Sequence, residues 1–239
     1  IIIKFSVMYP IIILAGGLGT RIRPAIGDIP KCLAPVGKNF FLDELLKKLS
    51  EYQAQEVILS LGYKSEMVKK ALRNQKHIKN LSFCEEKKPL GTGGAILNCI
   101  NNFNLEKVTV MNGDTWLEGD WSTFLKKKIS SKKEILMGVC KANNANRFGS
   151  LSVKDGRVIE FKEKKNSGKG IINAGIYSFD KNIFEVIHTK KSSFSLEKEI
   201  FSIHLKKLKI TPYYLKTKLF DIGIPEDYSI YLSKIHGQI

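Results

Sequence analysis

A glycine-rich segment near the start of the chain carries residue types that suit phosphate binding. It runs from Leu14 to Pro24 and contains the order Gly-Gly-Leu-Gly-Thr-Arg. Glycines let a backbone approach a triphosphate with its N–H groups turned inward, and the guanidinium of Arg21 is a planar clamp for phosphate oxygens. Neither the Walker A pattern nor the dinucleotide fingerprint fits. A purely structural glycine turn is the alternative, but Arg21 and the later Lys31 favour a triphosphate site of another kind.

Two carboxylates follow apolar segments and suit a divalent cation. Asp114 comes shortly after the apolar run 108–111, and Asp221 precedes Pro225, at which a helix is expected to begin. Mg²⁺ prefers one or two carboxylates together with substrate phosphates. Taken alone, Asp221 is equally well explained as a turn or capping residue. Together the two aspartates are the predicted metal pair.

In the first half of the chain, which must position these residues, apolar segments alternate with amphipathic ones. This alternation is typical of βαβ units with a parallel sheet. We expect strands at 11–15, 57–61, 81–84 and 108–111, and helices at 40–52 and 64–72. Because parallel strands end at one edge of a sheet, the glycine segment and Asp114 are predicted to lie together there, where open α/β sheets bind ligands.

The pattern changes to closely spaced strands after residue 135. Strands are expected at 151–153 and 158–161, on either side of the turn pair Asp155-Gly156, and at 171–179, before a closing helix at 226–235. No linker or repeat separates the halves. We therefore predict a single domain at 10–239, made of one half at 10–135 and a second half at 136–239 that forms a lobe on the same sheet. Residues 1–9 are interpreted as an extension, either foreign to the protein or an extra edge strand.

The composition indicates a globular protein with a strong positive charge. Hydrophobic residues make up 43% and charged residues 26% of the chain, and the net charge is +16. Such a charge could attract nucleic acid, but most of it is lysine, so a solvated surface that attracts anionic substrates is favoured. Four widely spaced cysteines without a metal-ligand pattern indicate a reduced, cytoplasmic protein. Neither a membrane span nor a complete signal peptide is expected.

The glycine segment and Lys31 resemble the signature of the sugar-1-phosphate nucleotidyltransferase family, a G-G-x-G-T-R loop followed shortly by Pro-Lys. The resemblance extends over residues 10–235. It implies an α/β, Rossmann-like fold of the nucleotide-diphospho-sugar transferase type: a mixed, mostly parallel sheet flanked by helices, with a small β-rich sugar-binding lobe. In this family the equivalent of Arg21 holds the triphosphate and that of Lys31 contacts phosphate. Cys32 departs from the pattern, since many members carry proline there.

A second segment, from Pro89 to Ala95, resembles the family's second nucleotide motif, which closes over the base and leads into a short helix. Glu86 stands where the family places a base-reading side chain. A carboxylate can accept from the adjacent N1–H and N2–H₂ groups of guanine, whereas uracil and thymine offer one donor on that edge. GTP is therefore expected, and the alternative makes Glu86 a plain surface charge. The predicted nucleotide contacts are Leu14, Ala15, Gly16, Gly17, Gly19, Thr20, Glu86, Pro89, Gly91 and Thr92.

The second half of the chain resembles the family's sugar-phosphate half. By this resemblance Gly149 and Asn173 approach sugar hydroxyls and Glu163 accepts from a hydroxyl pair, while Lys164 holds the sugar phosphate. Without the resemblance, the charged run around Lys164 would be interpreted as a solvated hairpin. Trp116 either covers the sugar or packs in the core.

The resemblance implies in-line attack by a sugar-phosphate oxygen on the α-phosphorus of the nucleotide, with release of pyrophosphate. Such transfers depend on positioning and charge neutralisation rather than on a general base. The predicted catalytic residues are Arg21, Lys31 and Lys164. Asp114 and Asp221 match the family's metal aspartates, and Mg²⁺ is the expected cofactor.

Within the family, residues 27–31 and 89–94 are most similar to the D-glycero-α-D-manno-heptose 1-phosphate guanylyltransferases, whose GDP-heptose feeds capsule or surface-layer glycans. A mannose-1-phosphate guanylyltransferase is the first alternative, and a uridylyltransferase acting on a hexose or amino-sugar 1-phosphate is the second. A catalytically silent regulatory homologue would be expected to lack Arg21, Asp114 or Asp221. A nucleic-acid-binding module would instead use the positive charge. We expect a monomer or homodimer with no nucleic-acid or membrane partner.

Overall fold

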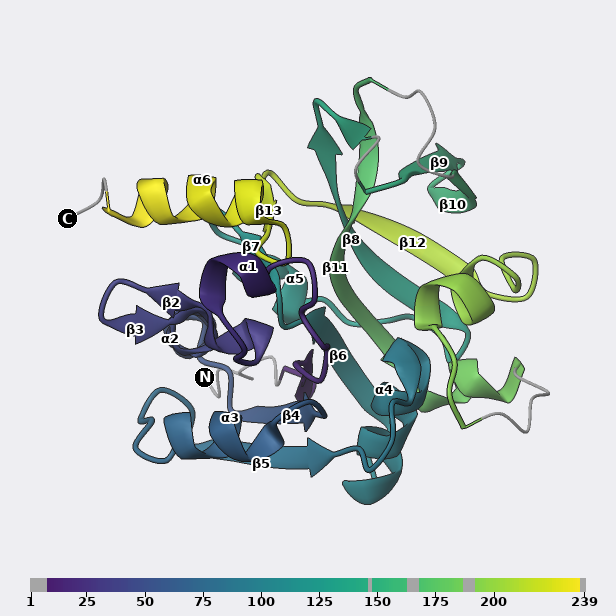
Figure 1. Ribbon diagram of the computed structural model, residues 1–239. Coiled ribbons are helices and arrows are strands. Elements are labelled where there is room, and N and C mark those ends of the chain that lie inside the picture. The colour runs from purple at the N-terminus through teal and green to yellow at the C-terminus, as the bar shows by residue number, and fades with distance from the viewer. Residues whose placement is uncertain (1–7, 146–147, 163–167, 187–191, 237–239) are drawn as a thin grey trace, which may run out of the picture.

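A seven-stranded sheet with the order β12-β8-β11-β6-β1-β4-β5 runs through the protein (Figure 1). The computed structural model describes residues 8–145, 148–162, 168–186 and 192–236. The strands of this sheet are β1 (Ile11–Leu14), β4 (Glu56–Leu61), β5 (Asn80–Glu85), β6 (Lys107–Asn112), β8 (Glu134–Ala142), β11 (Gly170–Asp180) and β12 (Lys209–Tyr214).

The sheet is mixed and mostly parallel, as the sequence predicted. Strand β1 pairs in parallel with β4 and β6, and β4 pairs in parallel with β5. Strand β11 is antiparallel to both β6 and β8, and β12 is parallel to β8. The second half of the chain therefore extends the sheet that the first half begins.

Helices cover both faces of the sheet, because its central strands are apolar on both sides. In β1, Ile11 and Ile13 belong to one buried cluster and Ile12 belongs to the other. The helices on the first face are α2 (Phe41–Glu51), α3 (Ser65–Ala71), α5 (Ser122–Lys126) and α6 (Pro225–His236). The opposite face carries α4 (Gly91–Asn102), the 3₁₀ helix η3 (Lys181–Val186) and the π-helix η4 (Leu196–Phe201).

Helix α2 illustrates how the pattern produces this packing. Its five apolar residues recur at helical spacing and are all buried, and Asp43 and Glu44 in its first turn suit the positive end of the helix dipole. Burial of each such side chain stabilises the fold by about 1.5–3 kcal/mol. The helix ends before Gln53, whose φ of 63° does not continue it. The prediction of a helix at 40–52 is confirmed to within a residue at each end.

Three small two-stranded sheets accompany the main one. The pair β9 (Ser150–Lys154) and β10 (Arg157–Lys162) is the predicted hairpin, and φ values of 48° at Asp155 and 70° at Gly156 identify the tight turn expected for this pair. The other sheets are β2 (Pro35–Val36) with β3 (Asn39–Phe40), and β7 (Thr115–Leu117) with β13 (Leu219–Asp221). The chain leaves the main sheet after Ala142 and rejoins it at Gly170, which is the register partner of Ala142.

The residues just before β1 pack against the domain. Met8 and Tyr9 are partly buried against the core, and the carbonyl of Pro10 accepts a hydrogen bond of 2.9 Å from the amide of Thr109. Residues 1–7, most of the predicted extension, lie outside the described part of the chain. None of the described helices is both long enough and apolar enough to cross a bilayer.

Candidate active site

The glycine segment and Asp114 leave the sheet from neighbouring strand ends. Leu14 is the last residue of β1 and the register partner of Asn112, the last residue of β6. The amide of Gly113 donates to the carbonyl of Leu14 at 3.0 Å, and a Cβ on Gly113 would lie only 2.6 Å from that oxygen. Glycine thus lets the chain turn closely past β1 toward Asp114. The predicted meeting of the two segments at one sheet edge is confirmed.

A cavity of about 570 Å³ opens at this edge, a size suited to a nucleotide. It is lined by eight of the ten predicted nucleotide contacts, which are Leu14, Ala15, Gly16, Gly17, Glu86, Pro89, Gly91 and Thr92. Lys31 and Asp114 also line it. Four other predicted site residues, Gly19, Thr20, Arg21 and Asp221, are not among its lining residues.

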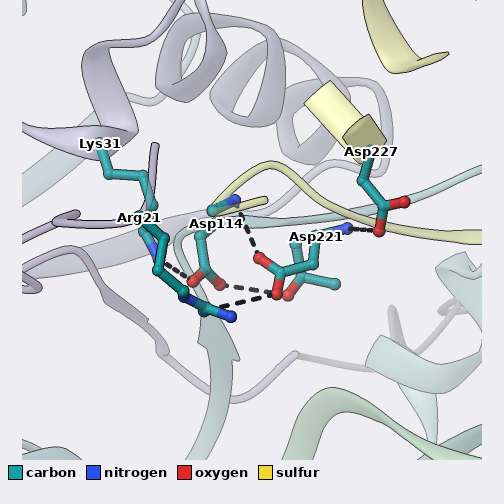
Figure 2. A network of polar contacts seen from close by, with 7 residues as sticks. Arg21, Lys31, Asp114, Asp221 and Asp227 are labelled. Atoms are coloured by element: carbon teal, nitrogen blue, oxygen red, sulfur yellow. Dashed lines mark hydrogen bonds and ion pairs between the residues drawn. The ribbon is translucent and has the colours of Figure 1, made fainter. Parts of the chain in front are cut away.

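Two cation–carboxylate pairs join the glycine segment to the predicted metal aspartates (Figure 2). The ammonium of Lys31, at the start of the 3₁₀ helix η1 (Lys31–Leu33), contacts Oδ2 of Asp114. Nη2 of Arg21, just before helix α1 (Arg23–Ile26), lies 3.8 Å from Oδ2 of Asp221. The Lys31 side chain is 16% exposed and that of Arg21 is 62% exposed. Arg21 is therefore open to an incoming phosphate, whereas Lys31 is held inside.

The pairing of β13 with β7 places Asp221 beside Asp114. Asp221 is the register partner of Thr115, the next residue after Asp114. Oδ1 of Asp221 accepts from the amide of Gly223 at 2.9 Å, and the amide of Asp221 donates to Oδ2 of Asp227 at 3.3 Å. One oxygen of Asp221 thus stabilises the turn before α6, and the other faces Arg21. The turn-residue interpretation and the metal interpretation of Asp221 are structurally compatible.

The electrostatics of this corner favour a bound cation. Burial raises the pKa of Asp221 above its ordinary value and the charge of Asp114 raises it further, while Gly223, Lys31 and Arg21 act in the opposite direction. Within the described residues no group of three or more His, Cys, Asp or Glu side chains could hold a metal by itself. Two carboxylates fit a hard cation that takes its remaining oxygen ligands from a phosphate and water, and they do not fit a closed zinc site.

Glu86 is held at the cavity wall rather than free at the surface. Its Oε2 accepts from the amide of Leu90 at 3.0 Å. Its Oε1 lies close to the backbone of two glycines. A Cβ placed on Gly62 would be 2.5 Å from this oxygen, and a Cβ placed on Gly16 would be 2.9 Å from it. Burial raises the pKa of Glu86, and the Leu90 amide lowers it in part. The surface-charge interpretation of Glu86 does not fit this placement, and its role in base reading stays a prediction.

The second nucleotide motif forms the first turns of α4 rather than a loop ahead of a short helix. The helix begins at Gly91 and is 12 residues long. Its glycines are needed for contact with the segment before η4, because a Cβ on Gly91 or Gly93 would lie within 2.5 Å of Phe194. Glycines disfavour helix interiors, so helix propensity does not predict that α4 begins within this motif.

Thr92 connects this motif to a residue that the sequence analysis missed. Its hydroxyl donates to Oε2 of Glu197 at 2.9 Å and accepts from the amide of Leu196 at 2.9 Å. Glu197 lines the cavity and lies on η4. No sequence pattern singles out Glu197 among its charged neighbours. Gly62 and Tyr63 also line the cavity and were missed, since they belong to an ordinary turn after β4.

A partly buried hydrogen-bond chain extends from Glu197 to Asn173. The hydroxyl of Tyr177 donates to Oε1 of Glu197 at 3.2 Å and accepts from Nδ2 of Asn173 at 2.6 Å. Oδ1 of Asn173 accepts from the amide of Gly175 at 2.9 Å. Gly175 has a φ of 70°, and a Cβ there would lie 2.7 Å from the Asn112 side chain. Asn173 is thereby coupled to the nucleotide motif, although it does not line the cavity.

The remaining sugar-side predictions are only partly described. Gly149 stands just before β9 with a φ of 79°, and its amide donates to the carbonyl of Ala145 at 3.0 Å. Glu163 and Lys164 lie outside the described residues. Trp116 packs edge-on against Phe41, with ring centroids 6.3 Å apart. Trp116 is partly buried, packs against the core and is not among the residues that line the cavity.

Comparison with known proteins decides the family. The sequence model of the family described as "Nucleotidyl transferase" matches residues 11–236. This chain is a member of the nucleotidyl transferase family. The prediction made from the glycine segment is confirmed, and the chain belongs to a family of nucleotidyltransferases.

Individual relatives resemble the chain along nearly all of its length. It is 37% identical to a D-glycero-α-D-manno-heptose 1-phosphate guanylyltransferase of Campylobacter jejuni, over 92% of this chain and 97% of the relative. It is 35% identical to an enzyme of the same name from Aneurinibacillus thermoaerophilus, over 91% and 94% of the two chains. The crystal structure of HddC from Yersinia pseudotuberculosis complexed with GMP-PN superposes with a TM-score of 0.81 at 35% identity, covering 95% of this chain and 99% of that one.

Proposed function

We propose that this nucleotidyltransferase transfers GMP from GTP to D-glycero-α-D-manno-heptose 1-phosphate, giving GDP-heptose and pyrophosphate for surface glycan synthesis. The observation that carries the proposal is the convergence at one cavity of the glycine segment, Lys31 and Asp114, with Arg21 and Asp221 beside them. Two relatives of 35% and 37% identity that bear the heptose guanylyltransferase name support the choice of substrates.

The nucleotide would enter with its triphosphate over the glycine segment and its base toward Glu86. The backbone of Gly16 and Gly17 gives close access to the phosphates, and the open guanidinium of Arg21 can neutralise the leaving pyrophosphate. Gly19 and Thr20 complete the proposed phosphate loop. Pro89, Gly91 and Thr92, with Leu14 and Ala15, would enclose the base and ribose.

The reaction itself forms one bond and breaks one. An oxygen of the sugar phosphate attacks the α-phosphorus, and the bond between that phosphorus and the α–β bridging oxygen breaks as pyrophosphate leaves. The attacking oxygen is already an anion, so no proton has to be removed from it. The protein is required to align the groups and to neutralise charge, which Arg21, Lys31 and Lys164 would do.

Asp114 and Asp221 would hold Mg²⁺. When bound, this cation supplies charge neutralisation at the phosphate oxygens. On the sugar side, Gly149, Glu163 and Asn173 are the proposed contacts. We place the reaction in the cytoplasm, since the four cysteines Cys32, Cys84, Cys99 and Cys140 are all free and buried.

Pyrophosphate release across a substrate panel tests the proposal. The four common nucleoside triphosphates are each combined with heptose, mannose and glucose 1-phosphates in the presence of Mg²⁺. We expect the highest kcat/KM with GTP and the heptose phosphate. A higher value with mannose 1-phosphate would reassign the sugar, a preference for UTP would reassign the base, and no turnover with any pair would contradict the enzymatic assignment.

A further inference from the structure

Lys31 occupies an unusual position for a residue expected to contact a substrate. Its ammonium contacts a carboxylate oxygen of Asp114 at the cavity wall, and both side chains are largely withdrawn from solvent, at 16% and 24% exposure. An ion pair so placed is screened less than one at the surface. Lys31 therefore forms a partly buried ion pair with Asp114, unlike a surface lysine that extends into solvent.

The turn after β13 leaves room for this ammonium. A Cβ placed on Gly223 would lie 2.9 Å from Nζ of Lys31 and also 2.9 Å from Oδ1 of Asp221. Any side chain at position 223 would therefore press on the Lys31 head group. The ammonium contacts Asp114 (Figure 2), and its charge also acts on Asp221, whose pKa it lowers.

A divalent cation held by Asp114 and Asp221 would compete with Lys31 for the carboxylate of Asp114. An ammonium and a metal ion repel one another, and a metal ion binds its carboxylate oxygens directly. Lys31 occupies Oδ2 of Asp114, and Oδ1 accepts from the hydroxyl of Thr115 at 3.2 Å, so neither oxygen is without a partner. The protein carries its own cation at the place proposed for the metal.

We infer that Lys31 and the divalent cation are alternative partners of Asp114, so that the metal binds there only when Lys31 moves to another anion. The phosphate of a bound substrate is the anion available in the cavity. This inference rests on the proposed metal-dependent function. It predicts that bound nucleotide increases the affinity for the metal, because a ligand that draws Lys31 away frees the carboxylate. Since such coupling is reciprocal, bound metal should also increase the affinity for the nucleotide.

Binding of Mn²⁺ to the purified full chain without any substrate tests the inference. The free Mn²⁺ signal is followed by electron paramagnetic resonance for the wild type, Lys31→Met and Lys31→Gln. We expect both variants to bind Mn²⁺ at least about fivefold more tightly than the wild type, because a partly buried competing charge has gone. Asp114→Asn should abolish the gain when combined with Lys31→Met.

A matched control separates competition at Asp114 from a general change of charge. Lys88→Met removes one positive charge from the same cavity wall, and Lys88 forms no ion pair or hydrogen bond with the residues that the structure describes. We expect its Mn²⁺ affinity to stay within about twofold of wild type. Equal affinities of wild type and both Lys31 variants would overturn the inference, as would a gain for Lys88→Met as large as that for Lys31→Met. Thermal unfolding confirms that each variant is folded.

The readout uses neither GTP nor a sugar phosphate. A failure of the substrate panel would therefore leave the Mn²⁺ result interpretable. Conversely, if the wild type is active and the Lys31 variants bind Mn²⁺ no more tightly than it does, the competition at Asp114 is overturned and the substrate assignment is unaffected.

Discussion

The amide of Ile222 donates a hydrogen bond of 2.9 Å to the carbonyl oxygen of Asp114. Ile222 follows Asp221 directly, so this bond fixes the backbone of one carboxylate residue against that of the other. The two residues lie far apart in the sequence, and the pairing of β7 with β13 joins them into one corner. A pair of carboxylates that must accept a metal in one geometry benefits from such a rigid backbone.

Replacement of either corner carboxylate should remove activity without unfolding the protein. For Asp114→Asn and Asp221→Asn we expect kcat/KM to fall by at least about 100-fold, because the neutral amides cannot hold a hard cation beside the phosphates. Pyrophosphate release over a Mg²⁺ titration measures the effect. Asp120→Asn, at an exposed position whose carboxylate accepts from the amide of Ser122, is the control and should retain near-wild-type activity. Full activity of Asp114→Asn would refute the proposed metal site.

Glu86 should make nucleotide use depend on pH. Burial raises its pKa, so the carboxylate that accepts from guanine is lost at a higher pH than for an exposed glutamate. We expect the KM for GTP to rise as the pH falls toward that pKa, and the rise to be missing in Glu86→Gln. The variant should also lose at least about tenfold of its preference for GTP over UTP. An undiminished preference would contradict base reading by Glu86.

The same shift has a consequence for stability. A carboxyl with a raised folded-state pKa favours the folded state most when it is protonated, below its unfolded pKa, and this contribution is lost as the pH rises through the folded pKa. Relative to Glu86→Gln, the wild type should therefore become less stable between acidic and neutral pH. Urea unfolding of both proteins across this range measures the difference.

A methyl group at Gly62 should disturb the cavity through Glu86. Its Cβ would lie 2.5 Å from Oε1 of Glu86 and 3.0 Å from the carbonyl of Gly16. We expect Gly62→Ala to raise the KM for the nucleotide about tenfold, because the carboxylate and the glycine segment must both shift. Gly168→Ala is the matched control, since no atom of the residues that the structure describes lies within 4 Å of its Cβ position. Equal KM values for the two variants would show that Glu86 tolerates the displacement.

Tyr177→Phe should act on the sugar phosphate more than on the nucleotide. The change removes the hydroxyl that joins Asn173 to Glu197, and leaves Nδ2 of Asn173 without this acceptor. We expect the KM for the sugar phosphate to rise several-fold and the free energy of unfolding to fall by about 1–2 kcal/mol. Tyr213→Phe, which removes an exposed hydrogen bond to Thr123, serves as the control. An altered KM for GTP alone would contradict the assigned position of Asn173.

Glu134 should contribute stability that is lost in acid. It is buried, and burial raises its pKa, but hydrogen bonds from Ser130, Lys209 and Thr211 outweigh this and lower the pKa to about 2. The contribution is present above the ordinary value of 4.5 and is lost as the pH falls toward 2. We expect Glu134→Gln to cost about 2 kcal/mol at pH 7 and less at pH 3 in urea unfolding. Exposed Glu160→Gln should change stability little at either pH.

Much of the fold could be predicted because local pattern and tertiary structure agree. The apolar runs of β1 and β6 end in glycines and an aspartate, and parallel pairing alone then brings them to one edge. Other features depend on contacts that no short pattern encodes. Gly91 and Gly93 of α4 leave room for Phe194 to pack closely, and Glu197 is held by Thr92, which lies far from it in the sequence. The contact between Lys31 and Asp114 likewise arises only in the folded chain.

The departure of the chain from the main sheet has a consequence for engineering. Ala142 and Gly170 are register partners in adjacent strands, so the segment between them starts and finishes at almost the same place. A segment whose two ends lie close together can be replaced by another segment without changing the path of the rest of the chain. This one includes Gly149, Glu163 and Lys164, all proposed for the sugar side, and excludes the glycine segment, Glu86 and the carboxylate corner. On the basis of these proposed sugar contacts, we expect a swap of this segment among relatives to alter acceptor choice while the donor nucleotide stays the same.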